Sequence, residues 1–380
     1  MQNSDLTPKH LTTRRTFIRQ SSLGLGAAAL ATSGISLSTL SACAQDPNGK
    51  KLGIALVGLG SYATHQLAPA LLETKDCYLA GIVTGTPSKA EEWKTKYNIP
   101  EKNIYNYENF DSIADNPDID IVYVVLPNSM HAEYTIRAAK AGKHVISEKP
   151  MSVSVAEGEQ MIAACKAAGK KLYIGYRLHY DPFNMEAMRL SQEKVYGNIK
   201  IVEASFGFRI GDPTQWRLRK NLAGGGAMMD VGIYVIQGAR YSTGEEPIAV
   251  TAQEYKTDPV KFAEVDETIF WQMEFPSGAV ANCATTYNSN IQRLFAAAEK
   301  GWFEIRPAYV YNGLQGETSD GPMQIQGINQ QAAHMDGVAH SIKTGEADRN
   351  ISGEEGLRDM KIIEAIYKSI ASGGQRITLG

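Results

Sequence analysis

The sequence predicts two domains: an α/β domain with a parallel sheet, then an α+β domain with a large, mainly antiparallel open sheet. Three observations support this prediction. Apolar strand-like segments alternate with helical ones between residues 51 and 175, and a glycine-rich turn follows the first of these strands. After about residue 180 the strands are longer, and apolar and polar residues alternate along them. A length of 380 residues suits two domains better than one.

The elements of the first domain, residues 51–175, follow from hydrophobic periodicity. We expect strands within residues 51–60, 77–85, 118–127, 143–150 and 170–176, with helices within 65–73, 87–97, 131–142 and 155–169. Strands joined through helices form a parallel sheet with right-handed crossovers. In the second domain, residues 176–380, we expect strands within 198–208, 247–255, 267–275 and 278–287, and a long helix at 353–373 that could pack back on the first domain.

The N-terminus, residues 1–44, resembles an export signal. Arg14 and Arg15 precede an apolar, small-residue stretch at 21–40, and an adjacent arginine pair is typical of the twin-arginine route to the periplasm. A membrane anchor is the alternative, but the stretch is rich in Gly, Ala and Ser and weak for a stable span. The signal could end by cleavage after Ala44 or by lipidation of Cys43, and residues 45–50 form a linker. We predict no membrane span in the mature chain.

Composition excludes several classes of function. A net charge of −3 gives no support for nucleic acid as a partner. The four cysteines, at positions 43, 77, 165 and 283, are far apart, and no His/Cys/Asp cluster has the spacing of metal ligands. We therefore expect no metal site.

The turn after the first strand carries a dinucleotide-binding pattern of the Rossmann type. Gly58, Gly60 and Ala63 match GxGxxG/A, with Ser61 and Tyr62 between them. The first glycine permits a tight turn, the second lets the backbone approach a pyrophosphate, and the third small residue lets the helix pack on the strand. The helix N-terminus adds partial positive charge. This context predicts a bound dinucleotide.

The end of the second strand favours NADP, although NAD stays possible. An acidic residue usually binds a free ribose hydroxyl at this position. This chain instead has Thr84 and, nearby, Lys89, which suit a 2′-phosphate. Lys89 could alternatively be a solvated helix lysine.

Further motifs point to one family. The segments "LPNSMH" (126–131), "EKPMS" (148–152) and "GGGAMMDVGIY" (224–234) follow the glycine turn in order. Together they resemble the glucose–fructose oxidoreductase / inositol dehydrogenase (Gfo/Idh/MocA) family. The segment "GYRLHYDPFN" (175–184) resembles most the branch of glucose–fructose and aldose–aldose oxidoreductases. The resemblance covers essentially the whole mature chain.

The resemblance implies roles for matching residues. Lys149, Asp230 and Tyr234 would form the catalytic group; many family members carry His where this chain has Tyr234. Besides the glycine turn, Thr84, Lys89 and Lys149, the residues that would contact the cofactor are Tyr107, Leu126, Pro127, Asn128, His131, Glu148, Arg177, Trp216, Arg217 and, on a weaker match, Tyr311. Those that would face a sugar are Tyr176, His179, Tyr180, Asp230 and Tyr234.

The chemistry of these residue types agrees with sugar oxidation. Oxidising an aldose at C1 removes a hydride and a hydroxyl proton, so a base is needed. A free tyrosine has a pKa of about 10, and a nearby ammonium favours the ionised phenol. Tyr234 with Lys149 would then act as an acid/base pair, while Asp230 could orient the sugar or hold Lys149. Structural alternatives exist: Tyr234 as a core aromatic, Asp230 as a helix cap and Trp216 as packing between domains.

An export signal on a nucleotide-dependent enzyme favours a tightly bound cofactor. The resemblance implies a ping-pong cycle in which one sugar becomes a lactone and a second sugar is reduced to an alditol. Three alternatives remain: an NAD-dependent glycoside hydrolase of the same fold, a sugar or nucleotide sensor, and an ordinary sugar or polyol dehydrogenase with exchangeable NAD(P). The open sheet predicts a homodimer or homotetramer.

Overall fold

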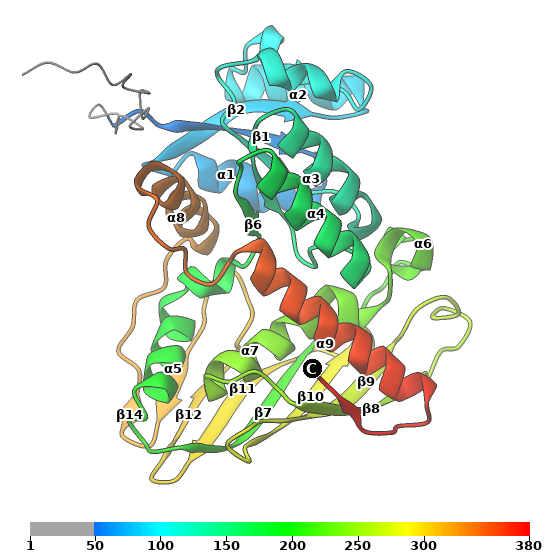
Figure 1. The fold of residues 1–380 in the computed structure, drawn as a ribbon, viewed down its shortest axis with the longest axis vertical. Coiled ribbons are helices and arrows are strands. Elements are labelled where there is room, and N and C mark those ends of the chain that lie inside the picture. The colour runs from blue at the N-terminus through cyan, green and yellow to red at the C-terminus, as the bar shows by residue number, and fades with distance from the viewer. Residues whose placement is uncertain (1–48) are drawn as a thin grey trace, which may run out of the picture. The chain divides into compact units, whose positions relative to one another are not determined.

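The part of the chain that we describe, residues 49–380 of a computed structural model, contains two sheets with helices packed on them (Figure 1). The predicted export signal, including Cys43, and residues 45–48 of the linker lie outside the described residues. Among the described helices, none has both the length and the apolar character to cross a bilayer.

The first sheet is parallel and six-stranded, with strand order β3-β2-β1-β4-β5-β6. Its strands are β1 (Leu52–Val57), β2 (Cys77–Val83), β3 (Ile104–Tyr105), β4 (Ile121–Val124), β5 (His144–Ser147) and β6 (Leu172–Ile174). Helices α2 (Pro87–Tyr97), α3 (His131–Lys140) and α4 (Val155–Ala167) connect them. The order reverses between β1 and β4, and in such sheets ligands bind outside the carboxyl ends of the strands at the reversal.

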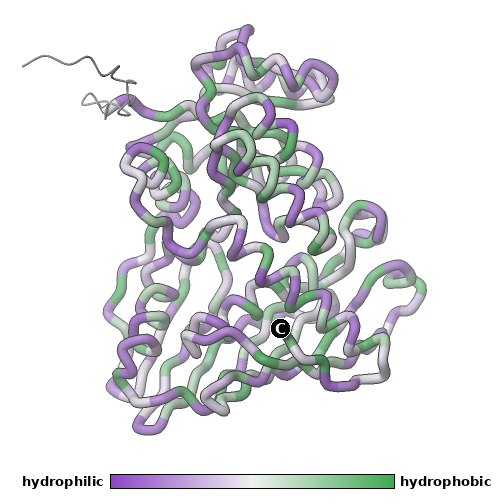
Figure 2. Tube along the Cα trace, in the orientation of Figure 1, coloured by the Kyte–Doolittle hydropathy of each residue, from purple (hydrophilic) through white to green (hydrophobic). Residues whose placement is uncertain are grey.

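The central strands are hydrophobic because the sheet is covered on both faces. Ile54, Leu56 and Val57 of β1 have no exposed surface, and neither have Val122 and Val124 of β4. The continuous apolar runs of the sequence therefore become the core of the first half, as expected for a buried parallel sheet. In Figure 2 the outer helices alternate between hydrophobic and hydrophilic residues.

The second sheet has nine strands in the order β14-β13-β12-β11-β7-β10-β9-β8-β15. They are β7 (Ile199–Gly207), β8 (Ala249–Tyr255), β9 (Thr268–Glu274), β10 (Val280–Thr286), β11 (Ile291–Ala298), β12 (Trp302–Ile305), β13 (Gly316–Thr318), β14 (Gly321–Pro322) and β15 (Ile377–Thr378). All pairs are antiparallel except β7 with β10. The sheet is thus mainly antiparallel, as predicted.

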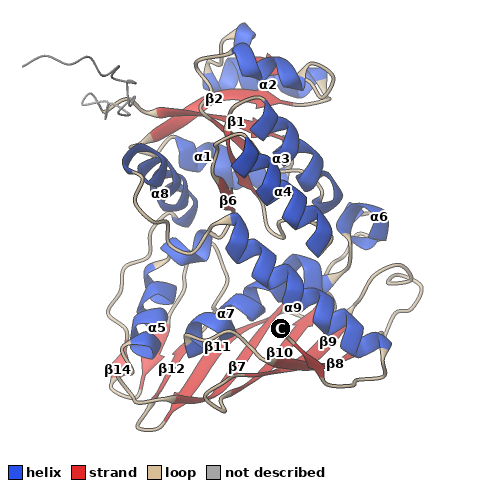
Figure 3. Ribbon diagram, in the orientation of Figure 1, coloured by secondary structure: helices blue, strands red, loops and turns tan. Residues whose placement is uncertain are grey.

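Helices cover one face of this sheet. In Figure 3, α5 (Pro182–Gln192), α7 (Ile233–Thr243) and α9 (Gly353–Ala371) lie over the strands on the same side. On the opposite side, large apolar side chains stay in contact with solvent: Ile201, Phe270 and Tyr255 are about half exposed. Tyr255 and Phe270 pack against each other, with ring centres 6.0 Å apart.

The chain returns to the first half after the second sheet. Helix α8 (Gln330–Thr344) carries Asp336, whose carboxylate accepts hydrogen bonds from the backbone N–H of Lys75 and Asp76. Helix α9 carries Glu364, which accepts from the backbone N–H of Val155 at 2.8 Å. The last third of the sequence therefore helps to position the first sheet against the second.

One buried carboxylate, that of Asp266, binds the backbone at the start of the segment that contains Asp230. Asp266, 5% exposed, accepts from the backbone N–H groups of Gly226 and Met228 and from the Tyr367 hydroxyl, at 2.7–2.8 Å. The segment Met228–Gly232 is a π-helical turn that runs directly into α7. Such turns are rare in proteins, and those that occur are often at functional sites.

We expect Asp266→Ala to lower the free energy of unfolding by about 3 kcal/mol, because it leaves buried N–H donors unpaired. Urea unfolding followed by circular dichroism measures this. The control is Asp320→Ala, an exposed aspartate that accepts only from the Tyr196 hydroxyl. A loss no greater than that of the control would mean that Asp266 does not fix this segment.

Candidate active site

A cleft of about 900 Å³ lies between the two halves, at the carboxyl ends of the strands of the first sheet. Most predicted site residues line it: Gly58, Gly60, Ser61, Tyr62, Thr84, Lys89, Tyr107, Leu126, Pro127, Asn128, His131, Glu148, Lys149, Arg177, Trp216, Arg217, Asp230, Tyr234 and Tyr311. Ala63 is buried in the π-helical turn behind the glycine loop, where a small side chain is needed. The structure brings these residues together; the role of each stays a prediction.

The glycine loop has the geometry that its sequence predicts. Gly58 follows β1 with φ +94°, and a Cβ there would lie 2.6 Å from the carbonyl oxygen of Val125. Gly60 lines the cleft, and a Cβ built on it has no neighbour within 4 Å. The missing side chain thus leaves room for a ligand to approach the backbone. The following helix differs from expectation: it begins as a π-helix, Ala63–Leu67, and continues as the short α1, Ala68–Leu71.

The far end of the cleft suits a phosphate better than a bare ribose. The Thr84 hydroxyl accepts from the backbone N–H of Thr86 at 3.2 Å, and Lys89 Nζ donates to the carbonyl of Leu59 at 3.0 Å. Lys89 therefore points to the glycine loop and is not merely solvated. The first turn of α2 contains no acidic residue. A 2′-phosphate would meet hydroxyls and a cation here, without carboxylate repulsion.

His131 joins the segment after β4 (126–131) to the segment after β5 (148–152). His131 is 1% exposed, and its ring nitrogens lie 2.8 Å from the carbonyl oxygens of Leu126 and Pro150. Burial lowers the pKa of His131, and the two carbonyl acceptors oppose that effect. Asn128 donates to the carbonyl of Ala223 at 2.8 Å and so contacts the second half. These two side chains position the backbone that lines the cleft.

Glu148 is a buried residue of the cleft lining. Its carboxylate accepts from the Tyr123 hydroxyl at 2.7 Å and from the backbone N–H of Lys149 at 3.2 Å. Burial raises the pKa of Glu148, against the effect of these donors and of the Lys149 charge.

Lys149 and Asp230 form an ion pair across the cleft. Lys149 Nζ donates to the Asp230 carbonyl oxygen at 2.5 Å and to its Oδ1 at 3.2 Å. The other carboxylate oxygen accepts from Arg217 Nε and from the Tyr287 hydroxyl, each at 2.9 Å. The carboxylate is therefore occupied on both oxygens, which is the geometry of a group that holds Lys149.

The pair stays ionised at neutral pH. Burial alone would raise the pKa of Asp230, but the charges of Arg217 and Lys149 and the Tyr287 hydroxyl hold it well below its usual range. Burial alone would lower the pKa of Lys149, but Tyr234, Asp230 and Glu148 raise it above its usual value. Each charge is thus maintained by the other.

Two cations flank the Tyr234 ring. Lys149 Nζ lies 4.7 Å from the ring centre and the Arg177 guanidinium carbon 5.2 Å from it. Arg177 is 3% exposed and donates to the carbonyls of Tyr309 and Val310 and to the side chain of Gln330. Its Nε has no partner among the described residues. This nitrogen is itself buried.

Aromatic contacts close one edge of the cleft. Tyr62 comes from the glycine loop and Tyr311 from the loop after β12, and their ring centres are 5.9 Å apart. The Arg177 guanidinium carbon lies 4.5 Å from the Tyr311 ring centre. The contact between Tyr62 and Tyr311 joins the two halves beside the glycine loop, where a pyrophosphate is expected.

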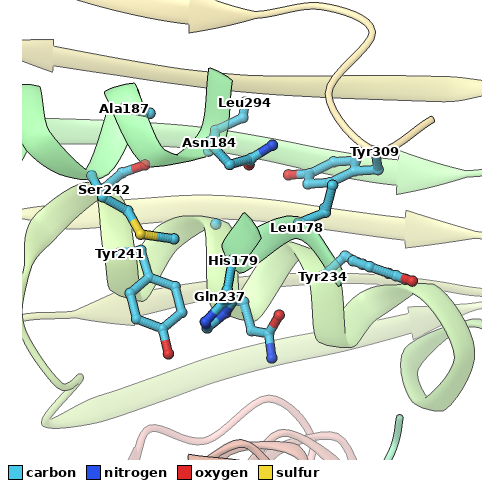
Figure 4. Close-up of a pocket in the computed structure, with 12 residues that line it drawn as sticks. Leu178, His179, Asn184, Ala187, Tyr234, Gln237, Tyr241, Ser242, Leu294 and Tyr309 are labelled. Carbon is cyan, nitrogen blue, oxygen red and sulfur yellow. The ribbon is translucent and has the colours of Figure 1, made fainter. Parts of the chain in front are cut away.

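Three residues expected to face a sugar do not line the cleft. Tyr176 donates to Asp359 at 2.7 Å, and Tyr180 packs edge-on against His334, with ring centres 5.6 Å apart. His179 Nδ1 lies 2.8 Å from the carbonyl oxygen of Arg349, and its ring faces a separate cavity of about 20 Å³ behind Tyr234 (Figure 4). The turn that contains them points into the interior, and only Arg177 of that motif lines the cleft; their contact with a sugar stays a prediction.

Sequence reasoning missed several residues of the cleft's second-half wall: Phe206, Phe208, Val231, Gln292, Tyr309 and Val310. Phe206 lies on a predicted strand, but its neighbour β11 was not predicted, because "IQRLFAAA" has no clear alternation and no glycine or proline at its ends. No group of His, Cys, Asp and Glu within residues 49–380 could hold a metal ion.

The residues present fit NADP. The open Gly60 backbone, the Thr84–Lys89 pair and the Arg177 side chain line one cleft, and Lys149 of the first half faces Asp230 and Tyr234 of the second across it. When bound, a nicotinamide supplies the hydride acceptor. The arrangement can hold a hydroxyl beside a tyrosine and a lysine, which is what proton transfer to or from a hydroxyl requires.

We expect Gly58→Ala to weaken NADP binding at least tenfold, because its Cβ would collide with the Val125 carbonyl. Gly142→Ala is the matched control: Gly142 has φ +73° but no neighbour within 4 Å, and it does not line the cleft. Both variants pay a backbone strain of about 1–2 kcal/mol, so only Gly58→Ala should lose nucleotide in a calorimetric titration. Equal affinities in the two variants would contradict the assignment of this loop.

Comparisons with known proteins agree with the geometry. Residues 52–176 match the model of the GFO/IDH/MocA oxidoreductase family with its NAD-binding Rossmann fold, and residues 185–304 match the GFO/IDH/MocA C-terminal domain. The crystal structure of aldose–aldose oxidoreductase from Caulobacter crescentus, complexed with glycerol, superposes with a TM-score of 0.84 and 47% identity, covering 87% of this chain and all of that one.

Two curated relatives are more distant. D-xylose 1-dehydrogenase (NADP⁺) of Haloarcula marismortui is 29% identical over 326 residues, 83% of this chain and 90% of the relative. D-glucoside 3-dehydrogenase of Escherichia coli is 25% identical over 353 residues, 86% of this chain and 97% of the relative. With both of its halves matched by the two family models, the chain belongs to the GFO/IDH/MocA oxidoreductase family.

Proposed function

We propose that this protein is an NADP-dependent sugar oxidoreductase that keeps its cofactor bound and works by a ping-pong cycle. It oxidises an aldose at C1 to the lactone and then reduces the carbonyl of a second sugar to an alditol. The observation that carries the proposal is Tyr234 flanked by Lys149 and Arg177 at the wall of a dinucleotide cleft. The names of the aldose–aldose oxidoreductase and of the NADP-dependent xylose dehydrogenase support the substrate class and the cofactor.

The roles of the residues follow from their contacts. Tyr234 accepts the hydroxyl proton of the aldose C1 and returns a proton to the carbonyl oxygen of the second sugar. Lys149 places its ammonium charge beside Tyr234, 4.7 Å from the ring centre. Asp230 holds Lys149 in that position. Tyr176, His179 and Tyr180 have no part in the proposal, because they lie outside the cleft lining.

Cofactor retention is supported by two features. The first is the contact between Tyr62 and Tyr311, which joins the two halves beside the glycine loop. The guanidinium of Arg177 packs on the Tyr311 ring. The twin-arginine signal predicted in residues 1–44 suits a protein that is folded around its cofactor before export to the periplasm. Outside the cytoplasm, bound NADPH must be reoxidised by a second substrate.

We also propose a homo-oligomer. The open face of the second sheet carries the exposed Ile201, Phe270 and Tyr255, and a second copy would cover them. Sedimentation equilibrium of the purified mature protein tests this, and a monomer at micromolar concentration would refute it. Fractionation of the exporting cells distinguishes a free periplasmic protein from one lipidated at Cys43.

Cofactor release is the first experiment for the proposed function. The purified mature protein, washed without nucleotide, should yield near-stoichiometric NADP on denaturation. Glucose alone should reduce that NADP once, and a second sugar should reoxidise it. Bound NAD without lasting reduction, together with release of free sugar from a glycoside, would indicate a hydrolase. An empty protein that turns over only with added NADP would indicate an ordinary dehydrogenase.

Tyr234→Phe isolates the proton-transfer step. We expect it to lower the rate of cofactor reduction by glucose by about 10²–10⁴-fold, while the amount of bound NADP stays the same. Stopped-flow absorbance of the reduced nicotinamide measures the rate. Tyr255→Phe, on the open face of the second sheet, is the control and should keep the full rate. An undiminished rate in Tyr234→Phe would remove the tyrosine from the mechanism.

A further inference from the structure

The floor of the cleft on its second-half side is part of the second sheet. β7 and β11 are antiparallel neighbours, and Gln292 is directly opposite Phe206. Both side chains are on the helix-covered face, in line with the buried Leu294 and Ala296 of β11. Gln292 is the polar exception in this apolar row. It is half-buried and lines the cleft.

The orientation of the Gln292 amide is fixed by the backbone. The N–H of Tyr309 donates to Gln292 Oε1 at 3.1 Å. Because only the carbonyl oxygen of an amide accepts from an N–H, the NH₂ group must be on the other side. No described residue accepts a hydrogen bond from Gln292 Nε2. The NH₂ group of Gln292 therefore points into the cleft without a protein acceptor among the described residues.

The neighbours of Gln292 are held by contacts with one another and with Arg177. The Tyr309 carbonyl accepts from Arg177 at 2.6 Å, and its ring stacks on Phe206 with centres 5.0 Å apart and planes at 17°. Phe206 also contacts Tyr234 edge-to-face at 5.6 Å. Phe206 therefore links the proposed acid/base residue to Gln292. An apolar ring beside a fixed donor is the arrangement that orients a polar ligand in an apolar pocket.

We propose that Gln292 is a specificity-determining residue, whose Nε2 donates to a sugar hydroxyl other than the one oxidised, while the sugar's C–H face packs on Phe206. The inference rests on the proposed function. A site built to hydrogen-bond a hydroxyl discriminates against an analogue that lacks it, because the buried donor is left unpaired. Gln292 would thus help to select which sugars the enzyme takes.

The experiment removes the donor and the hydroxyl separately. Gln292→Met removes the Nε2 donor and keeps a similar side-chain volume. Gln292→Glu also removes the donor but keeps an oxygen that accepts from the Tyr309 N–H. Each variant is assayed for reduction of the bound cofactor by glucose, by its 2-, 3-, 4- and 6-deoxy analogues and by xylose. Gln272→Met, an exposed glutamine on the opposite face of the sheet, is the matched control.

We expect both Gln292 variants to lose about tenfold in kcat/KM with glucose and to match the wild type on one deoxy analogue. Bound NADP should be unchanged in each variant. An equal loss on every sugar, or no loss on any, would falsify the inference while leaving the proposed function standing. If no aldose reduces the cofactor bound to the wild-type protein, the proposed function is overturned, and this inference with it.

Discussion

The site depends on one ion pair, between Lys149 of the first half and Asp230 of the second. Their side chains are 12% and 17% exposed, so each charge has lost most of its hydration. Removing one partner from such a pair leaves an uncompensated buried charge. Arg217 and Tyr287 bind the remaining lone pairs of the carboxylate, which keeps it from turning towards a ligand. The pair therefore joins the two walls of the cleft and sets the position of Lys149 beside Tyr234.

A second buried carboxylate anchors the helix that carries Tyr234. Asp359 of α9 has no exposed surface and accepts from Tyr176, Gln237 and Arg240, at 2.7–2.8 Å. Gln237 and Arg240 are on α7, so α7 is held from behind by Asp359 and at its start by the π-helical turn of Asp230. This network is the reason that the conspicuous "GYRLHY" motif is mostly structural. Its tyrosines and histidine pack in the interior, and its arginine alone reaches the cleft.

The first domain could be predicted from sequence because its signals are local. The glycine turn and the apolar runs of β1 and β4 each lie within a few residues. The second sheet was recognised as mainly antiparallel, but β11 to β15 were not predicted, since their pairing is set by distant partners. Phe206, Gln292 and Tyr309 meet only because β7 and β11 are neighbours. No spacing in the sequence reveals that contact, and the inward turn of Tyr176, His179 and Tyr180 was equally invisible.

The distribution of charge in the cleft favours a neutral substrate. A carboxylate substrate would need a free guanidinium fork. Arg177 cannot provide one, because its terminal nitrogens already donate to Tyr309, Val310 and Gln330. Arg217 is paired through Nε with Asp230, so an anion bound there would bring a second carboxylate next to the first. What remains is two single donors, Gln292 Nε2 and Lys149 Nζ, beside aromatic rings. Scattered donors and apolar faces match the hydroxyl oxygens and C–H faces of a sugar, and they leave a hydroxy acid without a partner for its charge.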